Sequence, residues 1–359
     1  MNTFKKIGLT ALGTTLVAGS AYAGEITASG DAGYTFSSEQ VGSRSDEGYG
    51  FNHDITFSGS GELDNGFTVS TTMILVEGAT LSSSNVALTM GGMGTITIGN
   101  GLGSVGGGFD AVTPFAYEEN HDGMKTTTAI DSVGSLTDGN AVYYASPSFD
   151  LGGASASFTL GYTPEAGDSA TGEGGVAAQS ANYGSGMAAG VKVSMAGLSA
   201  GIMGEEVKDD TGDGSVSGAS RREDAMNATW FANYSVGPVS FGYQKAGLDM
   251  GINAASTSAN AAKTVAAAGG FFESELMSVA FNVNENLSIS YGELTETYNA
   301  QDNASSAIAN VDMESDSIQF AYTMGSMSIK GYQTSTDNPG WDANADSDEV
   351  TELAVNFAF

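Results

Sequence analysis

The residues best suited to chemistry lie close together between positions 101 and 139. Glu118, Glu119, His121 and Asp122 crowd into five positions there, and His121 beside Asp122 could act as an acid–base pair. Hydrolysis would also need a nucleophile, and no serine stands at a spacing that singles it out. The same carboxylates could instead attract cations. An enzyme of the hydrolase class therefore stays open as an alternative to a site that handles ions.

Apolar and polar residues alternate along most of the chain. Near the C-terminus Leu353, Val355, Phe357 and Phe359 occupy every second position, which is the period of a β-strand. Similar runs recur, joined by short turns at one end and longer polar loops at the other. The pattern predicts sixteen strands, near 26–36, 51–63, 67–76, 84–90, 95–100, 140–147, 154–162, 187–194, 198–206, 225–236, 239–245, 271–283, 287–294, 314–324, 327–334 and 349–359.

The polar face of these strands carries more charge than a sealed core accepts. Asp31, Asp54, Glu62, Lys192 and Lys330 all share this face, and burying unpaired charges is costly. The polar face must therefore be wet, so the other face lies against an apolar medium. The fold class that follows is all-β, a transmembrane antiparallel β-barrel of sixteen strands, rather than a soluble sandwich or propeller. Its last strand should pair with its first, because a closed barrel has no free edge.

The N-terminus has the features of a cleaved export signal. Two lysines precede an apolar stretch over 7–18, and Ala21-Tyr22-Ala23 follows the small-x-small pattern of a cleavage site. We expect residues 1–23 to be removed and residues 24–359 to form the barrel. The apolar stretch is shorter than the ~20 residues that a spanning helix needs. The sequence therefore predicts no transmembrane helix.

Composition narrows the choice of partners. The chain has 42 acidic and 11 basic residues and a formal charge of −31, which becomes −33 when the two signal lysines leave. Nucleic acid and anionic surfaces are poor partners for such a chain, whereas cations are good ones. There is no cysteine, so stability must come from packing or backbone pairing. The 51 glycines are consistent with tight turns and a hydrogen-bonded barrel.

Residues 101–139 form a long connection without strand pattern, and such connections are usually functional. In a wide barrel, a loop folded inward would narrow the channel and place its carboxylates at the tightest point. We therefore interpret this segment as a constriction loop. Its candidate residues are Asp110, Phe115, Tyr117, Glu118, Glu119, His121 and Asp122, with Phe115 and Tyr117 expected to pack on the barrel wall.

Several segments resemble Gram-negative general-diffusion porins. The run Gly91–Gly99 is similar to the hairpin that precedes the constriction loop in that family, and Asn140–Phe149 is similar to the strand that follows it. Asp31-Ala32-Gly33 and Gly61–Gly66 fit the first hairpin of the family. The resemblance covers the whole mature chain and ends on Phe359, which resembles the terminal signal read by the outer-membrane assembly machinery.

The resemblance implies a sixteen-stranded, usually trimeric, water-filled barrel whose third outer loop folds into the lumen. It also implies loop carboxylates that face basic residues on the wall. Here Asn100 and Tyr143 stand where relatives often carry arginine, so no arginine ladder opposes the acids. The expected wall residues are Asp31, Asp54, Glu62, Asn100, Tyr143, Lys192 and Lys330.

Two outer loops have aspartates at calcium-like spacing. Asp209 and Asp213 follow the alternate-oxygen pattern of a calcium loop, although a serine stands where its glutamate belongs. Asp342 and Asp346 repeat the spacing without the glycine. A solvated acidic loop remains the alternative at both places.

The resulting expectation is a passive channel for small hydrophilic solutes and ions in the Gram-negative outer membrane. It would prefer cations, work as a homotrimer among outer-membrane lipid and lipopolysaccharide, bind no nucleic acid, and need no cofactor beyond possible calcium. A substrate-specific channel stays open as an alternative, as does a hydrolase.

Overall fold

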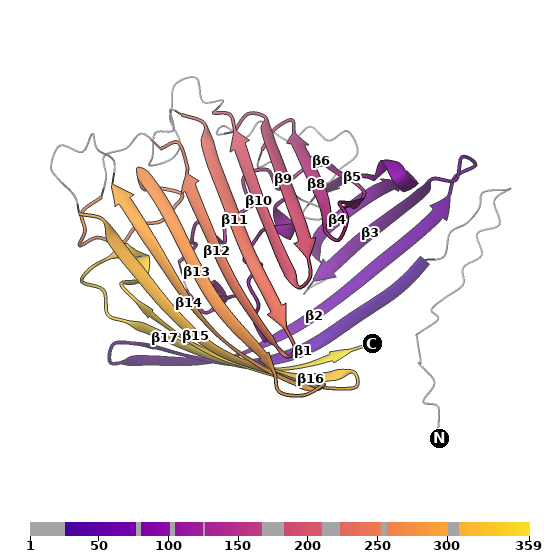
Figure 1. Cartoon of the computed structure of the whole chain (residues 1–359). Helices are drawn as coiled ribbons and strands as arrows, with labels where there is room; N and C mark the ends of the chain where they lie inside the picture. Colours follow the sequence, from indigo (N-terminus) through magenta and orange to yellow (C-terminus); the bar gives the residue numbers. More distant parts are fainter. Residues whose placement is uncertain are drawn as a thin grey trace.

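The chain folds into one antiparallel sheet that closes on itself (Figure 1). The computed structural model describes residues 26–76, 80–100, 105–124, 126–166, 183–209, 223–252, 257–300 and 309–359, so the expected signal segment 1–23 lies outside it. The strands in these ranges are β1 Ile26–Val41, β2 Arg44–Glu62, β3 Thr68–Val76, β4 Thr80–Thr89, β5 Thr95–Asn100, β6 Ala141–Ala145, β7 Phe149–Asp150, β8 Ser155–Thr163, β9 Gly186–Met195, β10 Leu198–Val207, β11 Ala225–Val236, β12 Val239–Asp249, β13 Gly270–Asn282, β14 Leu287–Ala300, β15 Val311–Met324, β16 Met327–Asp337 and β17 Asp348–Ala358.

Closure of the sheet is made by its two terminal strands. β1 pairs with β2 on one side and with β17 on the other, in a register that runs from Asp31 opposite Ala358 to Val41 opposite Asp348. Phe359 continues this pairing, since its N–H and C=O both bond to Gly30 at 2.9 Å. The prediction that the last strand pairs with the first is confirmed, and the sheet has no free edge.

The described residues form sixteen barrel strands, because β6 and β7 are two parts of one strand. Both pair with β8, and Ser146-Pro147-Ser148 separates them. Proline has no N–H to give to the ladder, which explains the interruption. The predicted sixteen-stranded antiparallel barrel is therefore confirmed.

The barrel has an apolar outer face and a polar inner face. On β15, Ile318 and Phe320 are exposed on the outside, whereas Ser317 and Gln319 are buried on the inside. On a strand, successive side chains point to opposite faces, so the alternation in sequence becomes two chemically distinct surfaces. On the outer face near the long-loop end, Lys245 pairs with Glu273 at 2.8 Å. The hydrocarbon-facing band therefore ends below this ion pair.

The first hairpin extends farther than the alternation predicted. β1 and β2 stay paired to Val41 and Arg44, with only a two-residue turn between them, where a loop over 37–50 was expected. Polar residues occupy both faces of this extension, so the hydrophobic pattern disappears although the backbone pairing continues. Periodicity reports which face is apolar and misses strands that are polar on both faces.

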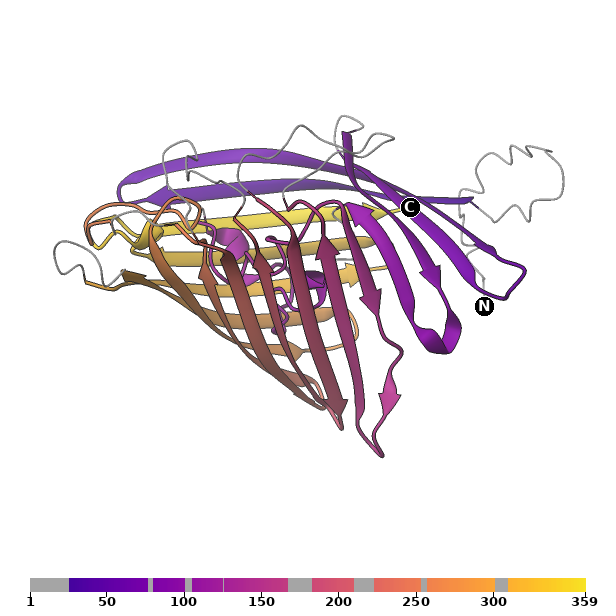
Figure 2. The ribbon, with the colours of Figure 1, turned by 90° about the horizontal axis from the view of Figure 1, so that it is seen from above.

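Helical structure in the described ranges is limited to four short 3-10 turns, η2 Gly91–Met93, η3 Gly106–Gly108, η4 Asn120–Gly123 and η5 Pro339–Trp341. None of the helices in the described part of the chain is long and apolar enough to cross a membrane. Seen from above, the described residues between β5 and β6, which contain η3 and η4, lie inside the ring of strands (Figure 2). We call these residues, 105–124 and 126–140, the inward loop.

Candidate functional site

Inward-facing polar side chains hold the backbone of the inward loop against β12, β14 and β15. The N–H of Val112 donates to Gln244 Oε1 at 2.8 Å, and the N–H of Ala116 donates to Ser290 Oγ at 2.9 Å. Gln319 hydrogen-bonds to the next two residues: it accepts from the N–H of Tyr117 at 3.0 Å and donates to the carbonyl of Glu118 at 2.7 Å. Each polar wall residue thus satisfies a backbone group that would otherwise be unpaired.

Two buried carboxylates hold the far part of the loop. Glu296 on β14 accepts from the N–H of Ala129 at 2.7 Å and from the hydroxyl of Ser274. Glu205 on β10 accepts from the N–H of Gly134 at 2.8 Å and from the hydroxyl of Thr137 at 2.8 Å. A buried carboxylate is tolerable only when it is hydrogen-bonded in this way. The course of the loop across the wall is therefore fixed from Val112 to Thr137.

Glu205 and Glu296 were missed by the sequence analysis. Both stand in the middle of strands at positions with inward parity, and both are buried. A mid-strand acid on the inner face was the signal that could have identified them. It was not recognised because the same face carries acids that are exposed to the lumen.

Glycines on the wall make room for aromatic side chains of the loop. A Cβ on Gly190 would lie 2.5 Å from ring atoms of Phe109, and one on Gly292 would lie 2.5 Å from the ring of Phe115. Phe109 also packs edge-on against Phe231, with ring centroids 6.1 Å apart. Phe115 therefore lies against the barrel wall. The missing side chains let the loop approach the sheet more closely than any other residue type would allow.

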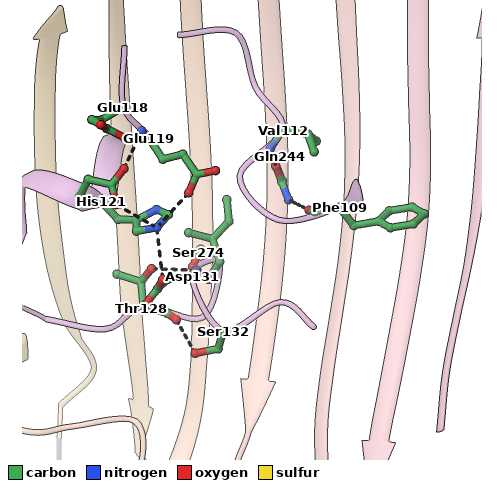
Figure 3. Close-up of polar contacts among 12 residues, drawn as sticks. Phe109, Val112, Glu118, Glu119, His121, Thr128, Asp131, Ser132, Gln244 and Ser274 are labelled. Carbon is green, nitrogen blue, oxygen red and sulfur yellow. Dashed lines mark hydrogen bonds and ion pairs between the residues drawn. The ribbon is translucent and has the colours of Figure 1, made fainter. Parts of the chain in front are cut away.

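A histidine surrounded by carboxylates lies where η4 crosses the inner wall. His121 Nε2 is 3.2 Å from Glu119 Oε2, 3.3 Å from Asp131 Oδ1 and 4.0 Å from Asp122 Oδ1. Figure 3 shows the imidazole between Glu119 and Asp131. The ring is 7% exposed, whereas the three carboxylates are 37–40% exposed. The carboxylates therefore line the lumen side of the cluster, and the imidazole lies behind them.

Burial and mutual repulsion shift the protonation of these loop residues. Burial, followed by repulsion from Glu119, raises the pKa of Asp110 to about 7. Burial also raises the pKa of Glu119, although His121 counteracts it. For His121, burial alone would lower the pKa, but the hydrogen bond to Asp131 and the three nearby carboxylates raise it to about 9. The cluster is therefore a coupled set of groups with a surplus of negative charge.

Glu118 and Tyr117 form the next part of the loop. The Tyr117 hydroxyl donates to Glu352 of β17 at 2.9 Å, and burial together with this bond raises the pKa of the phenol. Burial likewise raises the pKa of Glu118, and repulsion from Asp122 adds to it. Lys330 on β16 places its ammonium 5.1 Å from the centre of the Tyr117 ring. Tyr117 therefore packs between an acid and a base of the wall.

The expected wall residues fall into three groups. Lys192 and Lys330 both point inward, and the Lys192 ammonium lies 4.8 Å from the centre of the Phe109 ring. Asp31 and Asp54 face each other across β1 and β2 on the inner face, away from the outward Tyr34. Glu62 lies exposed at the end of β2.

Tyr143 and Asn100 complete the set of expected wall residues. Tyr143 is only 4% exposed, and its hydroxyl donates to the carbonyl of Thr137 at 3.3 Å. It lies behind the inward loop, so its position differs from that of an exposed wall residue. Asn100 is the last residue of β5, and its side chain lies outside the described part of the structure.

A cavity of about 320 Å³ lies between η4 and the wall formed by β1, β2, β16 and β17. Its lining includes Asp122 from the loop and Tyr332 from β16. The ionisable carboxylates of the lining are Glu39, Asp46, Glu47, Asp122 and Glu352, and no lysine, arginine or histidine is among its lining residues within the described ranges. The loop and the opposite wall thus present the same sign of charge to this space.

Two outer loops pack against the inner wall above the inward loop. Trp341 of η5 is fully buried, its Nε1–H donates to the carbonyl of Glu296 at 3.1 Å, and its ring centroid is 4.7 Å from that of Phe272. Lys263 donates to the carbonyl of Trp341 at 2.7 Å, and burial lowers the pKa of this lysine. These contacts join residues 257–269 to residues 338–347.

The candidate calcium residues are only partly described. The Asp342 carboxylate accepts from the N–H of Asn344 at 3.0 Å, which is a local turn contact. Asp346 lies beside Gly42, at the tip of the first hairpin. Asp209 follows β10, and Asp213 lies outside the described residues. Calcium at these loops stays a prediction.

A family model described as "Gram-negative porin" matches residues 8–359. The chain belongs to the Gram-negative porin family. Solved porin structures share its fold at low identity. OmpF of Salmonella typhi, in complex with daunomycin, is 14% identical with a TM-score of 0.68, over 94% of this chain and 98% of that one. No curated protein matches the sequence.

Two further solved porin-like structures extend the comparison. An anion-selective porin from Comamonas acidovorans is 13% identical with a TM-score of 0.63, over 94% of this porin and 100% of that chain. OmpT of Vibrio cholerae, in a trimer form, is 11% identical with a TM-score of 0.61, again over 94% and 100%. Family and fold together make this protein a general diffusion channel of the Gram-negative outer membrane.

Proposed function

We propose that this porin admits small hydrophilic solutes and prefers cations over anions. The observation that carries the proposal is the acidic cavity between η4 and the wall of β1, β2, β16 and β17. A passage lined by one sign of charge concentrates counter-ions and repels ions of the same sign. Exposed Glu119 and Asp122 on the loop and Asp31 and Asp54 on the wall add to the negative potential.

The two inward lysines oppose this potential only weakly. The Lys192 ammonium lies 4.8 Å from the centre of the Phe109 ring and 5.9 Å from that of Phe231, so aromatic rings cover part of its charge. Lys330 lies beside Tyr117, whose hydroxyl bonds to Glu352. The Comamonas acidovorans porin is described as anion-selective, so the fold alone does not determine the sign of the preference. The charged side chains of each porin therefore determine whether it prefers cations or anions.

The reversal potential in a salt gradient tests the proposal. Purified protein in a planar bilayer, with KCl more concentrated on one side, should give a reversal potential of the sign expected when potassium permeates more easily than chloride. Screening limits exposed charges to roughly 8 Å at physiological ionic strength, so the preference should weaken as salt rises. A reversal potential of the chloride sign would refute the cation preference. Block that saturates with one solute would instead favour a substrate-specific channel.

We also propose a homotrimer, and an export signal at residues 1–23. The trimer form of Vibrio cholerae OmpT supports the first, and the small-x-small sequence at 21–23 supports the second. Closure of single channels in three equal steps would indicate three pores per particle. N-terminal sequencing of the mature protein should begin at Gly24. A chain that starts at Met1 in the outer membrane would contradict the signal.

Hydrolysis is not part of the proposal. Within the described residues, the His121 imidazole contacts the carboxylates of Glu119, Asp122 and Asp131, whereas the hydrolase alternative requires a serine hydroxyl beside it. Assays of ester and peptide cleavage with purified protein check this directly, and an activity that disappears in His121→Gln would restore the alternative.

A further inference from the structure

The cluster around His121 has the composition of a transition-metal site. One imidazole nitrogen and three carboxylates, from Glu119, Asp122 and Asp131, converge on one side of the inward loop. The ligand atoms of Glu119, His121 and Asp122 all lie within 4.8 Å of one another. Ligand atoms around a tetrahedral zinc ion with bonds of about 2.0–2.1 Å are about 3.3 Å apart. The separation of His121 Nε2 from Glu119 Oε2, 3.2 Å, matches this spacing, and that from Asp122 Oδ1, 4.0 Å, is wider. Asp131 Oδ1 lies 3.3 Å from the same nitrogen, beside this group of three.

The state of the imidazole is a second observation that points to a ligand. The ring is nine-tenths buried, and its Nε2 edge faces the carboxylates (Figure 3). Its Nδ1 has no hydrogen-bond partner among the described residues. A proton on Nε2 can point at only one oxygen, although three carboxylates converge there. A cation at this position can contact several of them together with the nitrogen.

A further buried atom lacks a partner in the same part of the loop. Asp110 Oδ1 is buried and accepts no hydrogen bond from the part of the chain that the structure describes, and Asp110 is close enough to Glu119, Asp122 and Asp131 to be repelled by them. Unpaired buried acceptors and like charges are both destabilising. Two added positive charges at His121 would offset this excess of negative charge.

The position of the cluster makes the metal accessible from the pore. The three carboxylates are exposed toward the lumen, whereas His121 lies behind them. The backbone is already arranged, because the N–H of Glu119 donates to Asp122 Oδ2 at 2.8 Å and fixes the start of η4. Few large movements are therefore needed to bring the ligands together.

We propose that Glu119, His121 and Asp122 bind one divalent transition-metal ion of the zinc class on the inward loop, with Asp131 as a supporting carboxylate beside His121. An imidazole ligand suits zinc, cobalt, nickel and copper, whereas calcium takes six to eight oxygen ligands. The bound ion makes the loop two units less negative and reduces the cation preference of the pore. The metal site itself does not depend on that preference, and binding is measured without conductance.

Zinc titration of the purified, folded porin tests the site, in excess calcium so that acidic outer loops are occupied. The wild type should bind one zinc ion per chain. Loss of a supporting group around a metal costs roughly 10–100-fold in affinity. Loss of the ligand in His121→Gln should therefore weaken zinc binding at least tenfold, and so should Asp131→Asn.

His53→Gln is the matched control, because His53 lies on β2 and stacks on Phe51 at a centroid distance of 6.3 Å. Its zinc affinity should equal that of the wild type. Equal zinc binding by wild type and His121→Gln would overturn the assignment, as would an equal loss in the His53 variant. If His121→Gln does not fold, the Asp131→Asn variant decides the question. Displacement of the zinc by calcium would also overturn it.

Discussion

Replacing Glu296 with leucine should release the far part of the inward loop without opening the barrel. The carboxylate accepts from the N–H of Ala129 at 2.7 Å and from Ser274, and all three residues are buried. Leucine is similar in size but leaves both donors unpaired. Each unsatisfied buried donor costs about 1–3 kcal/mol, so the local cost is about 2–6 kcal/mol. The strands keep their backbone ladder, so global unfolding changes much less.

Hydrogen exchange at the Ala129 amide measures this local cost. A loss of about 2 kcal/mol corresponds to exchange roughly 30-fold faster, because every 1.4 kcal/mol is a factor of ten. The open-channel current should also become noisier as the loop moves in the lumen. Glu62→Leu is the control, since Glu62 is an exposed acid at the end of β2. An Ala129 amide that exchanges less than threefold faster in the Glu296 variant would refute the role of this carboxylate.

Three further changes have definite expected outcomes. Gly292→Ala should displace the Phe115 ring and change single-channel conductance, because the new Cβ would lie 2.5 Å from that ring, whereas Gly204→Ala, whose Cβ meets nothing closer than 3.9 Å, should leave conductance unchanged. Equal conductance changes in both would argue against close packing of the loop. Lys192→Gln removes one of the inward bases and should raise the ratio of potassium to chloride permeability; an unchanged ratio would show that this charge does not act on ions in the lumen. Deleting Phe359 removes two backbone bonds that close the barrel and should reduce the yield of folded protein, measured by heat-sensitive migration in gels, and an unchanged yield would contradict this.

The barrel could be predicted from sequence because its two faces meet different media. Leu353, Val355, Phe357 and Phe359 alternate because one side of β17 faces hydrocarbon, and each of the predicted strands has a counterpart in the structure. The extension of β1 and β2 to Val41 and Arg44 could not be predicted in this way, because both of its faces are polar.

The candidate site was less accessible to sequence reasoning. The acidic stretch of the loop pointed to Glu119, His121 and Asp122 as neighbours, because they are adjacent in the chain. Asp131 joins them only because Glu296 holds Ala129 to the wall and folds the loop back toward His121. Tyr143 has the inward parity expected of it, but the loop covers it. Such long-range contacts depend on the path of the loop across the wall, which no local pattern contains.

The reversal potential of the wild-type pore in a KCl gradient tests the central claim most directly. The acidic lining of the cavity beside η4 predicts a potential of the potassium sign. The combined variant Glu119→Gln and Asp122→Asn removes two loop acids and should move the reversal potential toward zero. Single-channel currents should remain measurable for the wild type and for this variant. A wild-type potential at zero or of the chloride sign would contradict the account.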